Sequence, residues 1–535
     1  MTTIDTHAGA TTRADGSGLV AKVAAWTVSS DHKRIGRLMV AEAMVCGLAA
    51  AVIGVLIGLE RLSNGYGIFP GDATVQLVAM FRYLLVFGAL APFMIGLAVA
   101  VVPMQVGSRA IAFPRLAQFG FWAWDLGSVL VIVSLVANGG PGGGNTNMVD
   151  LYVLGVGMAA AGLAAAAVSV ASTVLTSRAP GMTTDMVPAL SWGGLVSSVA
   201  AVLALPVVIG TVTYLYVDHT YARVAFGGNK AVSDWLGFAL TQPMTYVFAV
   251  VAAAVLADIA PVAAGARNPL RGAVYAGLGL ISTGLLGAVT QSQHPLATDG
   301  SAADTVSSLI PYLLLNGLPV LGILVVLGAS LFVLKQGSPK VGAAFVFAFM
   351  GTGVLLLGMV ASMLQNLESA GLAGTVFEEG ATTLVVHGAV MAGLGALLHW
   401  APKLWGVVVP EGKALPLVGV SLVGAVLAGV GNLLAGFSDQ PGATVDGFDY
   451  DGPRALWNVV VAAGHALFAL GLVGVALAIV SALRSGTKAV DDPWNGHTLE
   501  WAIPSPAPRD NFAALATVGS AEPVLDAKPS KEASA

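Results

Sequence analysis

The sequence has very few of the residues that build disulfide-stapled or cysteine-ligated domains. Its single cysteine, Cys46, lies inside an apolar segment, which excludes a disulfide framework and a cysteine-based zinc or iron–sulfur site. Charged residues make up only 10% of the chain, and the net charge of −5 leaves no basic stripe for nucleic-acid binding. The sequence also has no P-loop, nucleophile elbow or H-E-x-x-H zinc helix, so no common soluble-enzyme motif guides the interpretation.

What the sequence does contain is long apolar runs. Hydrophobic residues make up 56% of its 535 positions and the mean hydropathy is +0.82, which is typical of a polytopic membrane protein. About twelve segments are long enough to cross some 30 Å of hydrocarbon as helices. A helix makes all its backbone hydrogen bonds within the segment, as a single span in lipid must. The predicted fold is therefore all-α, a bundle of about twelve transmembrane helices. The predicted spans are 37–60, 76–102, 118–138, 151–174, 187–216, 235–264, 270–293, 306–334, 341–364, 381–409, 414–437 and 454–484.

The distribution of positive charge predicts how this bundle is oriented. One set of loops and helix ends carries most of the lysines and arginines. The alternate set carries only Arg61, Arg223, Lys230 and Arg454. Because positive residues accumulate on the cytoplasmic side, both termini are predicted to be cytoplasmic. The chain is divided accordingly into a polar N-terminal segment, 1–28, a membrane domain, 29–485, and an extended proline-rich tail, 486–535.

Several polar side chains fall within the predicted spans, where such groups are costly and usually face the bundle interior or a cavity. Those predicted for the outer half are Arg82, Gln242, Gln293, His294 and His387. His465 is predicted to lie nearer the middle of the last span. Imidazole and amide groups at one depth can surround a cofactor, because His nitrogen is a common metal ligand. The alternative is that each group makes an interhelical hydrogen bond, and residue types alone do not separate the two readings.

The stretch TQPMTY, residues 241–246, concentrates these features in the sixth span. Pro243 predicts a kink that frees the carbonyl of Ala239. Tyr246 follows Gln242 by four residues and so lies on the same helix face. The stretch is therefore a candidate site, although a tyrosine there is also consistent with ordinary packing.

The acidic residue Asp258 lies near the predicted cytoplasmic end of the same span. Two arginines follow it in the next loop, and we expect it to pair with Arg267 or Arg271. A role in a proton relay is the alternative, because intramembrane carboxylates serve in such relays.

Three motifs resemble the catalytic subunit I of cytochrome c oxidases, in the haem–copper oxidase superfamily. The segment SSDHKRIGRLMVAEAM at 29–44 resembles the TDHKRIG sequence that leads into that family's first helix. VVPMQVGSRAIAFPRLAQFGFW at 101–122 is similar to the loop after its second helix. DDPWNGHTLEWAIPSPAPRDNF at 491–512 is similar to its C-terminal motif. The motifs occur in the family's order, and the family has twelve helices with cytoplasmic termini, so the resemblance covers roughly residues 29–512.

The resemblance implies a copper site on helices six and seven, built from an H-P-E-V-Y motif and an H-H pair. Here Gln242 stands at the first copper-ligand position and Met244 at the position of the acid, while Tyr246 is retained at the family's catalytic tyrosine position. Gln293 and His294 stand in place of the histidine pair. Carboxamide oxygen is a weak neutral donor to copper, so this set of residues argues against tight copper binding.

The resemblance also implies haem iron held by histidines on helices two and ten. The helix-two position falls near Phe81, and that span has no histidine. On helix ten, TTLVVHGAV makes His387 a haem ligand, but only if about five residues are deleted from the alignment; without that gap the ligand positions fall on Gly380 and Thr382. His294 is a further candidate ligand for haem or a metal. One haem is therefore compatible with the residues, through His387 or His294.

Two functions remain open from the sequence. The first is a divergent oxidase subunit that passes electrons to oxygen through haem without an ordinary haem–copper centre or proton pumping. The second is a redox-silent paralogue that acts as a structural or assembly subunit, or as a pore. Both readings place the chain in the plasma membrane of a bacterium, surrounded by lipid and beside other oxidase-like subunits. Cytochrome c or a similar electron donor is a partner only in the first.

Overall fold

The computed structural model describes residues 28–62, 68–442, 453–485, 488–514 and 517–528. Within these ranges the chain forms helices and two isolated β-bridges, without a strand. Twelve helical spans in the described ranges are long and apolar enough to cross a membrane. The predicted all-α bundle of about twelve transmembrane helices is therefore confirmed.

Eight of these spans are single helices and four are composite. The single helices are α2 (His32–Glu60), α5 (Pro114–Val136), α6 (Thr146–Thr176), α7 (Ala189–Thr220), α14 (Ala343–Gln365), α15 (Phe377–Trp405), α16 (Glu411–Phe437) and α17 (Arg454–Ser485). The composite spans are α3–η1–α4 (Gly71–Tyr83, Leu84–Leu90, Ala91–Gln105), η3–α8–α9 (Gly228–Ala231, Val232–Leu240, Gln242–Ala264), α10–η4–α11 (Arg271–Ile281, Ser282–Gly284, Leu285–Thr290) and α12–η5–α13 (Ala302–Tyr312, Leu313–Gly317, Leu318–Gln336).

The sixth span is interrupted at Thr241, whose backbone is extended with φ −131° and ψ −150°. The hydroxyl of Thr241 donates to the carbonyl of Gly237 at the end of α8. Pro243 lies in the first turn of α9, where its missing N–H leaves no helical hydrogen bond unmade. The kink predicted at Pro243 is thus a complete break that starts a new helix at Gln242.

The seventh span is shorter than predicted. Helix α11 ends at Thr290, because Gln291 adopts a left-handed conformation with φ 54°. The chain leaves the helix there, so Gln293 and His294 lie in the loop that follows rather than on a helix face. This loop position changes which groups their side chains can reach.

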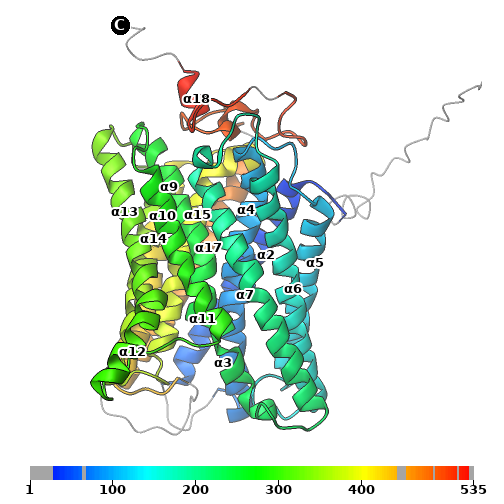
Figure 1. Cartoon of the computed structure of the whole chain (residues 1–535), viewed down its shortest axis with the longest axis vertical. Coiled ribbons are helices and arrows are strands. Elements are labelled where there is room, and N and C mark those ends of the chain that lie inside the picture. Colours follow the sequence, from blue (N-terminus) through cyan, green and yellow to red (C-terminus); the bar gives the residue numbers. More distant parts are fainter. Residues whose placement is uncertain (1–27, 63–67, 443–452, 486–487, 515–516, 529–535) are drawn as a thin grey trace, which may run out of the picture.

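Three helices form the interior of the bundle. The most apolar 18-residue stretches of the α3–η1–α4 span and of α15 are completely buried, and α9 is buried along almost its whole length. Helices α4, α9 and α15 also pack directly against one another. The most apolar parts of the other spans are less buried, at 39–67%. Figure 1 shows the helices upright and side by side. Of the haem and copper positions implied by the resemblance, Gln242 and His387 lie on these interior helices and Phe81 lies in the same span as α4, whereas Gln293 and His294 lie in the loop after α11.

The C-terminal segment folds over one end of the bundle, the tail face, where Figure 1 shows it in orange and red above the helices. It contains η7 (Leu499–Ala502) and α18 (Pro523–Asp526). The side chains of Trp501 and Ile503 are buried there, and the ammonium of Lys403 donates to the carbonyls of Asp491 and Ile503. The domain boundary at residue 485 stays a prediction, but the described part of the tail packs closely against the membrane domain.

Candidate functional site

Gln242 belongs to a buried cluster of three carboxamides, the amide cluster, with Asn316 and Asn366. Its Nε2 atom donates to Asn316 Oδ1 at 2.7 Å and to the carbonyl of Leu315 at 3.3 Å. Its Oε1 atom accepts from Asn366 Nδ2 at 2.6 Å, and the same nitrogen donates to Asn316 Oδ1 at 2.8 Å. Both ends of the Gln242 side chain are therefore engaged by neighbours from η5 and from the end of α14.

The two other predicted metal positions contact different partners. Gln293 Nε2 lies 3.1 Å from Glu378 Oε1 and 3.4 Å from the hydroxyl of Thr241. His294 Nε2 lies 2.9 Å from the hydroxyl of Thr290. The three side chains of the predicted metal set thus bind different partners: Gln242 binds the two asparagines, Gln293 lies against Glu378 and Thr241 on other spans, and His294 lies against Thr290 in its own span.

Tyr246 is buried on α9 and faces α14. Its hydroxyl lies 3.5 Å from the carbonyl oxygen of Met359. A Cβ atom added to Gly284 would come within 2.7 Å of the Tyr246 Cβ, so the ring fits into a close contact with η4. The tyrosine at the family's catalytic position is packed between helices.

His387 lies against the last span. Its ring stacks on Phe468, with centroids 3.7 Å apart and planes 7° from parallel. The ring of His465 approaches it edge-on at 5.4 Å, and Phe81 approaches His465 in the same way at 5.4 Å. The Nδ1 atoms of both histidines are buried without a hydrogen-bond partner. The cavity beside His387 measures about 10 Å³, roughly the space of one water molecule.

A buried ion pair between Arg61 and Glu379 lies at the end of the bundle opposite the tail face, where α2 ends and α15 begins. The guanidinium of Arg61 donates to both carboxylate oxygens of Glu379, at 2.9 and 3.2 Å, and to the carbonyl of Gly442 at 3.3 Å. The two side chains are only 2% and 3% exposed. Arg82 lies 3.8 Å from the same carboxylate, so two cations share one anion at this end.

Near the tail face, Gln105 joins two carboxyl groups. Its Nε2 atom donates to Asp258 Oδ2 and to Glu500 Oε1, and its Oε1 atom accepts from the hydroxyl of Ser191. Trp400 Nε1 also donates to Glu500 Oε1, at 3.2 Å, while Glu500 Oε2 has no partner. Burial raises the pKa of the Glu500 carboxyl, and the hydrogen bonds it accepts oppose that shift.

The two arginines predicted to pair with Asp258 contact other groups. Arg267 lies 3.5 Å from the carboxylate of Glu522. Arg271 donates to the carbonyl of Val187 at 3.0 Å. The hydrogen bond from Gln105 takes the place of the expected ion pair at Asp258.

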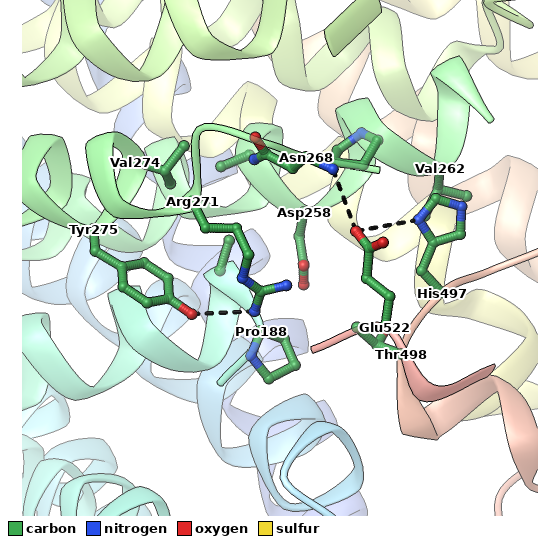
Figure 2. Close-up of a pocket in the computed structure, with 13 residues that line it drawn as sticks. Pro188, Asp258, Val262, Asn268, Arg271, Val274, Tyr275, His497, Thr498 and Glu522 are labelled. Carbon is green, nitrogen blue, oxygen red and sulfur yellow. Dashed lines mark hydrogen bonds and ion pairs between the residues drawn. The ribbon is translucent and has the colours of Figure 1, made fainter. Parts of the chain in front are cut away.

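A small cavity of about 30 Å³ lies beside this group (Figure 2). Arg271 and Tyr275 line one side, His497 and Glu522 line the other, and the Asp258 side chain lies between them. His497 Nδ1 is 3.8 Å from Glu522 Oε1, and neither ring nitrogen of His497 makes a hydrogen bond. The cavity has room for about one or two water molecules.

Sequence reasoning missed most partners of these groups. Asn316, Asn366, Gln105 and Glu379 were not singled out, although a lone polar residue such as Asn316 in LLLNGLP was an available signal. In the described ranges, no three His, Cys, Asp or Glu side chains lie close enough together to hold a metal ion.

The comparisons with known proteins agree with the fold. Residues 34–474 match the protein family described as Cytochrome C and Quinol oxidase polypeptide I. The chain is 24% identical to cytochrome c oxidase subunit 1 of Alkalihalophilus pseudofirmus, in an alignment that covers 94% of this chain and 82% of that protein. It is 27% identical to cytochrome c oxidase subunit 1 of Corynebacterium glutamicum, covering 94% and 88%. It is 26% identical to the putative cytochrome c oxidase subunit 1-beta of Streptomyces avermitilis, covering 94% and 91%. This chain therefore belongs to the cytochrome c and quinol oxidase polypeptide I family.

Proposed function

We propose that this protein is a redox-silent member of its family, which keeps the twelve-span scaffold and serves as a structural or assembly subunit in the bacterial plasma membrane. The amide cluster carries the proposal. Gln242 stands at a copper-ligand position, but its oxygen and nitrogen are engaged by Asn316 and Asn366. Copper does not fit this set, because a neutral carboxamide is a weak donor and this one is already hydrogen-bonded.

Haem does not fit the interior either. A haem on His387 needs an open face of the imidazole, whereas Phe468 stacks on that ring at 3.7 Å. Phe81, at the helix-two ligand position, has no donor atom. Helices α4, α9 and α15 pack directly together, and the cavity beside His387 measures about 10 Å³. The packed interior supports a scaffold more than an electron carrier.

A second function, electron transfer through a single haem, is supported by one observation. The Nδ1 atoms of His387 and His465 are buried without partners, and such atoms cost free energy unless something binds them. A haem at this point would require Phe468 and His465 to move away from His387. Under this reading cytochrome c or a similar donor is a partner.

We further propose that the tail face is cytoplasmic, because most lysines and arginines lie in the loops on that side. The two termini, predicted to be on the same side, lie outside the described residues, as does almost all of the predicted N-terminal segment 1–28. We expect the outer helices to contact neighbouring oxidase-like subunits, which a subunit I scaffold would bind. The structural or assembly role requires such partners, because a subunit without redox activity acts through the subunits that it binds.

Cofactor analysis of the full-length protein, purified from its own membranes, tests these proposals. We expect no Soret band in the reduced-minus-oxidised spectrum and no stoichiometric copper or iron. A catalytic subunit 1 from one of the bacterial relatives, purified in the same detergent, is the control that shows cofactors survive the procedure.

Each other outcome selects a different function. Two haems and one copper per chain would overturn the scaffold proposal. One haem that disappears in His387→Ala but persists in His294→Ala would establish the single-haem alternative instead. If no cofactor is found, co-purification of other oxidase subunits, and their loss when this chain is deleted, is the expected sign of a scaffold.

A further inference from the structure

A cavity of about 410 Å³ opens on the tail face, where α9 and α15 end, α14 and α16 begin, and tail residues 493–495 cover them. Its volume falls within the range of about 300–1,000 Å³ that is usual for small-molecule sites. None of its lining residues belongs to the amide cluster or to the pair His387 and His465. The cavity is therefore separate from the positions at which the family binds its cofactors.

The most buried polar group in the lining is the imidazole of His399. It lies six residues before the end of α15, or about 9 Å below that end along the helix. Only 4% of His399 is exposed, and its ring nitrogens make no hydrogen bond to another described residue. A buried polar group without a partner costs free energy, so this ring favours a ligand that forms a hydrogen bond with it.

Three tryptophans fix the orientation of this imidazole. Trp400 and Trp501 approach it edge-on, with ring centroids 4.8 and 5.2 Å away. Trp494 of the tail lies nearly parallel to it, with 15° between the planes, and its Nε1 atom donates to the His399 carbonyl at 2.8 Å. The ring is thus held in place before any ligand arrives, which lowers the entropic cost of binding.

The walls of the cavity are mainly apolar. Ile259 and Val262 line it from α9, and Phe345 lines it from α14. The indole of Trp494 adds a second aromatic group. Aromatic rings pack against one another with a gain beyond the area they bury, so these walls favour a ligand with a flat aromatic ring.

Two opposite charges lie at the mouth of the cavity. Lys340 precedes α14 and Glu411 begins α16, and both residues are exposed. Glu411 Oε2 accepts from the backbone nitrogen of Ala343 at 2.7 Å, which is a neutral donor. Neither charge forms an ion pair with another described residue. A simple cation or anion would be attracted by one of them and repelled by the other, whereas a ligand that carries both charges is complementary to the mouth.

We propose that this cavity binds a free aromatic amino acid whose ring carries a hydrogen-bonding group, with tyrosine as the representative ligand. Its carboxylate pairs with Lys340 and its ammonium with Glu411. Its ring packs against Phe345 and Trp494, and its hydroxyl forms a hydrogen bond with the imidazole of His399. The proposal does not depend on whether the protein is redox-silent, because no residue of the site belongs to the cofactor positions.

The test uses the full-length protein in detergent and radiolabelled L-tyrosine, which should bind saturably with one molecule per chain. Three analogues then compete with it. L-Phenylalanine lacks the hydroxyl, tyramine lacks the carboxylate, and 4-hydroxyphenylpropionate lacks the ammonium. Each should compete about tenfold more weakly than unlabelled tyrosine, because each leaves one polar group of the cavity without its partner.

Two variants locate the ligand in this cavity. In His399→Phe, tyrosine should lose its preference over phenylalanine but keep its preference over tyramine. In Lys340→Gln the reverse is expected. The matched control is Lys335→Gln, which removes an exposed cation at the end of α13, outside the cavity, and should keep both preferences.

These preferences are ratios measured on one preparation, so a partial loss of folded protein does not change them. Wild type that shows no saturable tyrosine binding, or that binds phenylalanine equally well, would overturn the proposal. A variant at His399 or Lys340 that keeps both wild-type preferences would also overturn it, because the ligand would then bind elsewhere.

Discussion

Arg61 and Glu379 show how a single pair of residues can fix the ends of two distant helices. Arg61 follows the last residue of α2, and Glu379 lies in the first turn of α15. Their bidentate contact is almost completely removed from solvent. A buried charge left without its partner is far more costly than the pair itself is stabilising.

We expect Arg61→Gln to destabilise the protein by about 3–5 kcal/mol, because among the described residues Glu379 would then keep one cationic neighbour, Arg82, at 3.8 Å. The loss is measured by denaturant-induced unfolding in a fixed detergent. The matched variant, Arg61→Met/Glu379→Leu, removes both charges and should be more stable than Arg61→Gln alone. If the double variant were the less stable of the two, the ion pair would be a net source of stability and this reasoning would fail.

The residue scale also marks a limit of sequence reasoning. Gln242 was identified from its cost inside an apolar span, which is a local property. Its partners Asn316 and Asn366 lie 74 and 124 residues away, on helices whose rotation about their axes no local pattern specifies. For the same reason the sequence predicts that His465 lies within the last span but does not predict its contact with His387.

At the scale of elements, α14 and α15 approach each other through glycine. A Cβ atom on Gly351 of α14 would lie 2.6 Å from the backbone nitrogen of Ala392 and 2.6 Å from the carbonyl oxygen of Gly388, both on α15. Neither contact can relax by a side-chain rotation, because both atoms belong to the backbone. The close approach of these two helices therefore requires glycine at this position, as is common between membrane helices.

We expect Gly351→Ala to cost about 1–3 kcal/mol, since the two helices must separate to admit the methyl group. Gly353, two residues further along α14, offers a matched control, because its added Cβ would meet nothing within 4 Å. Gly353→Ala should be neutral or stabilising by up to about 1 kcal/mol through its higher helix propensity. Thermal unfolding of the two variants in one detergent compares them, and equal losses of stability would contradict this account of the packing.

Helix existence was predictable and helix continuity was not. Twelve spans follow from hydropathy, which depends only on composition within a window. The end of α11 at Thr290 depends on the left-handed backbone of Gln291, and glutamine carries no signal for that conformation. Pro243 did signal a disturbance in the sixth span, but the break at Thr241 also needs the contact between its hydroxyl and Gly237.

At the scale of the whole molecule, the tail joins helices that are distant in sequence. Its polar, proline-rich composition predicted an extended segment, because nothing local revealed that Trp501, Ile503 and Phe512 would be buried against the bundle. Asn511 hydrogen-bonds to His32 and to Lys33 on α2, which connects the tail to the first span. The stability of the bundle should therefore depend on the groups that hold the tail.

Glu500 is such a group, and its ionisation predicts how stability changes with pH. Burial raises its pKa in the folded protein above the value of about 4.3 expected for an unfolded chain. Below that value both states are protonated and Glu500 contributes no pH dependence. Above it the unfolded state releases a proton that the folded state still holds, so stability falls as pH rises until the folded pKa is passed.

The difference in Tm between wild type and Glu500→Gln, followed from pH 4 to 8 in one detergent, measures this effect directly. We expect wild type to lose stability relative to the variant as the pH rises, because the variant carries no charge at this position. Asp526→Asn is the control, since a hydrogen bond from Ser520 and the charge of Arg267 lower the pKa of Asp526, whose stabilising effect is lost only as pH falls toward its range. Its difference from wild type should stay flat above pH 5. If wild type instead gained stability over Glu500→Gln with rising pH, Glu500 would be ionised in the folded protein, and its negative charge would stabilise the packing of the tail. That result would contradict a raised pKa for Glu500.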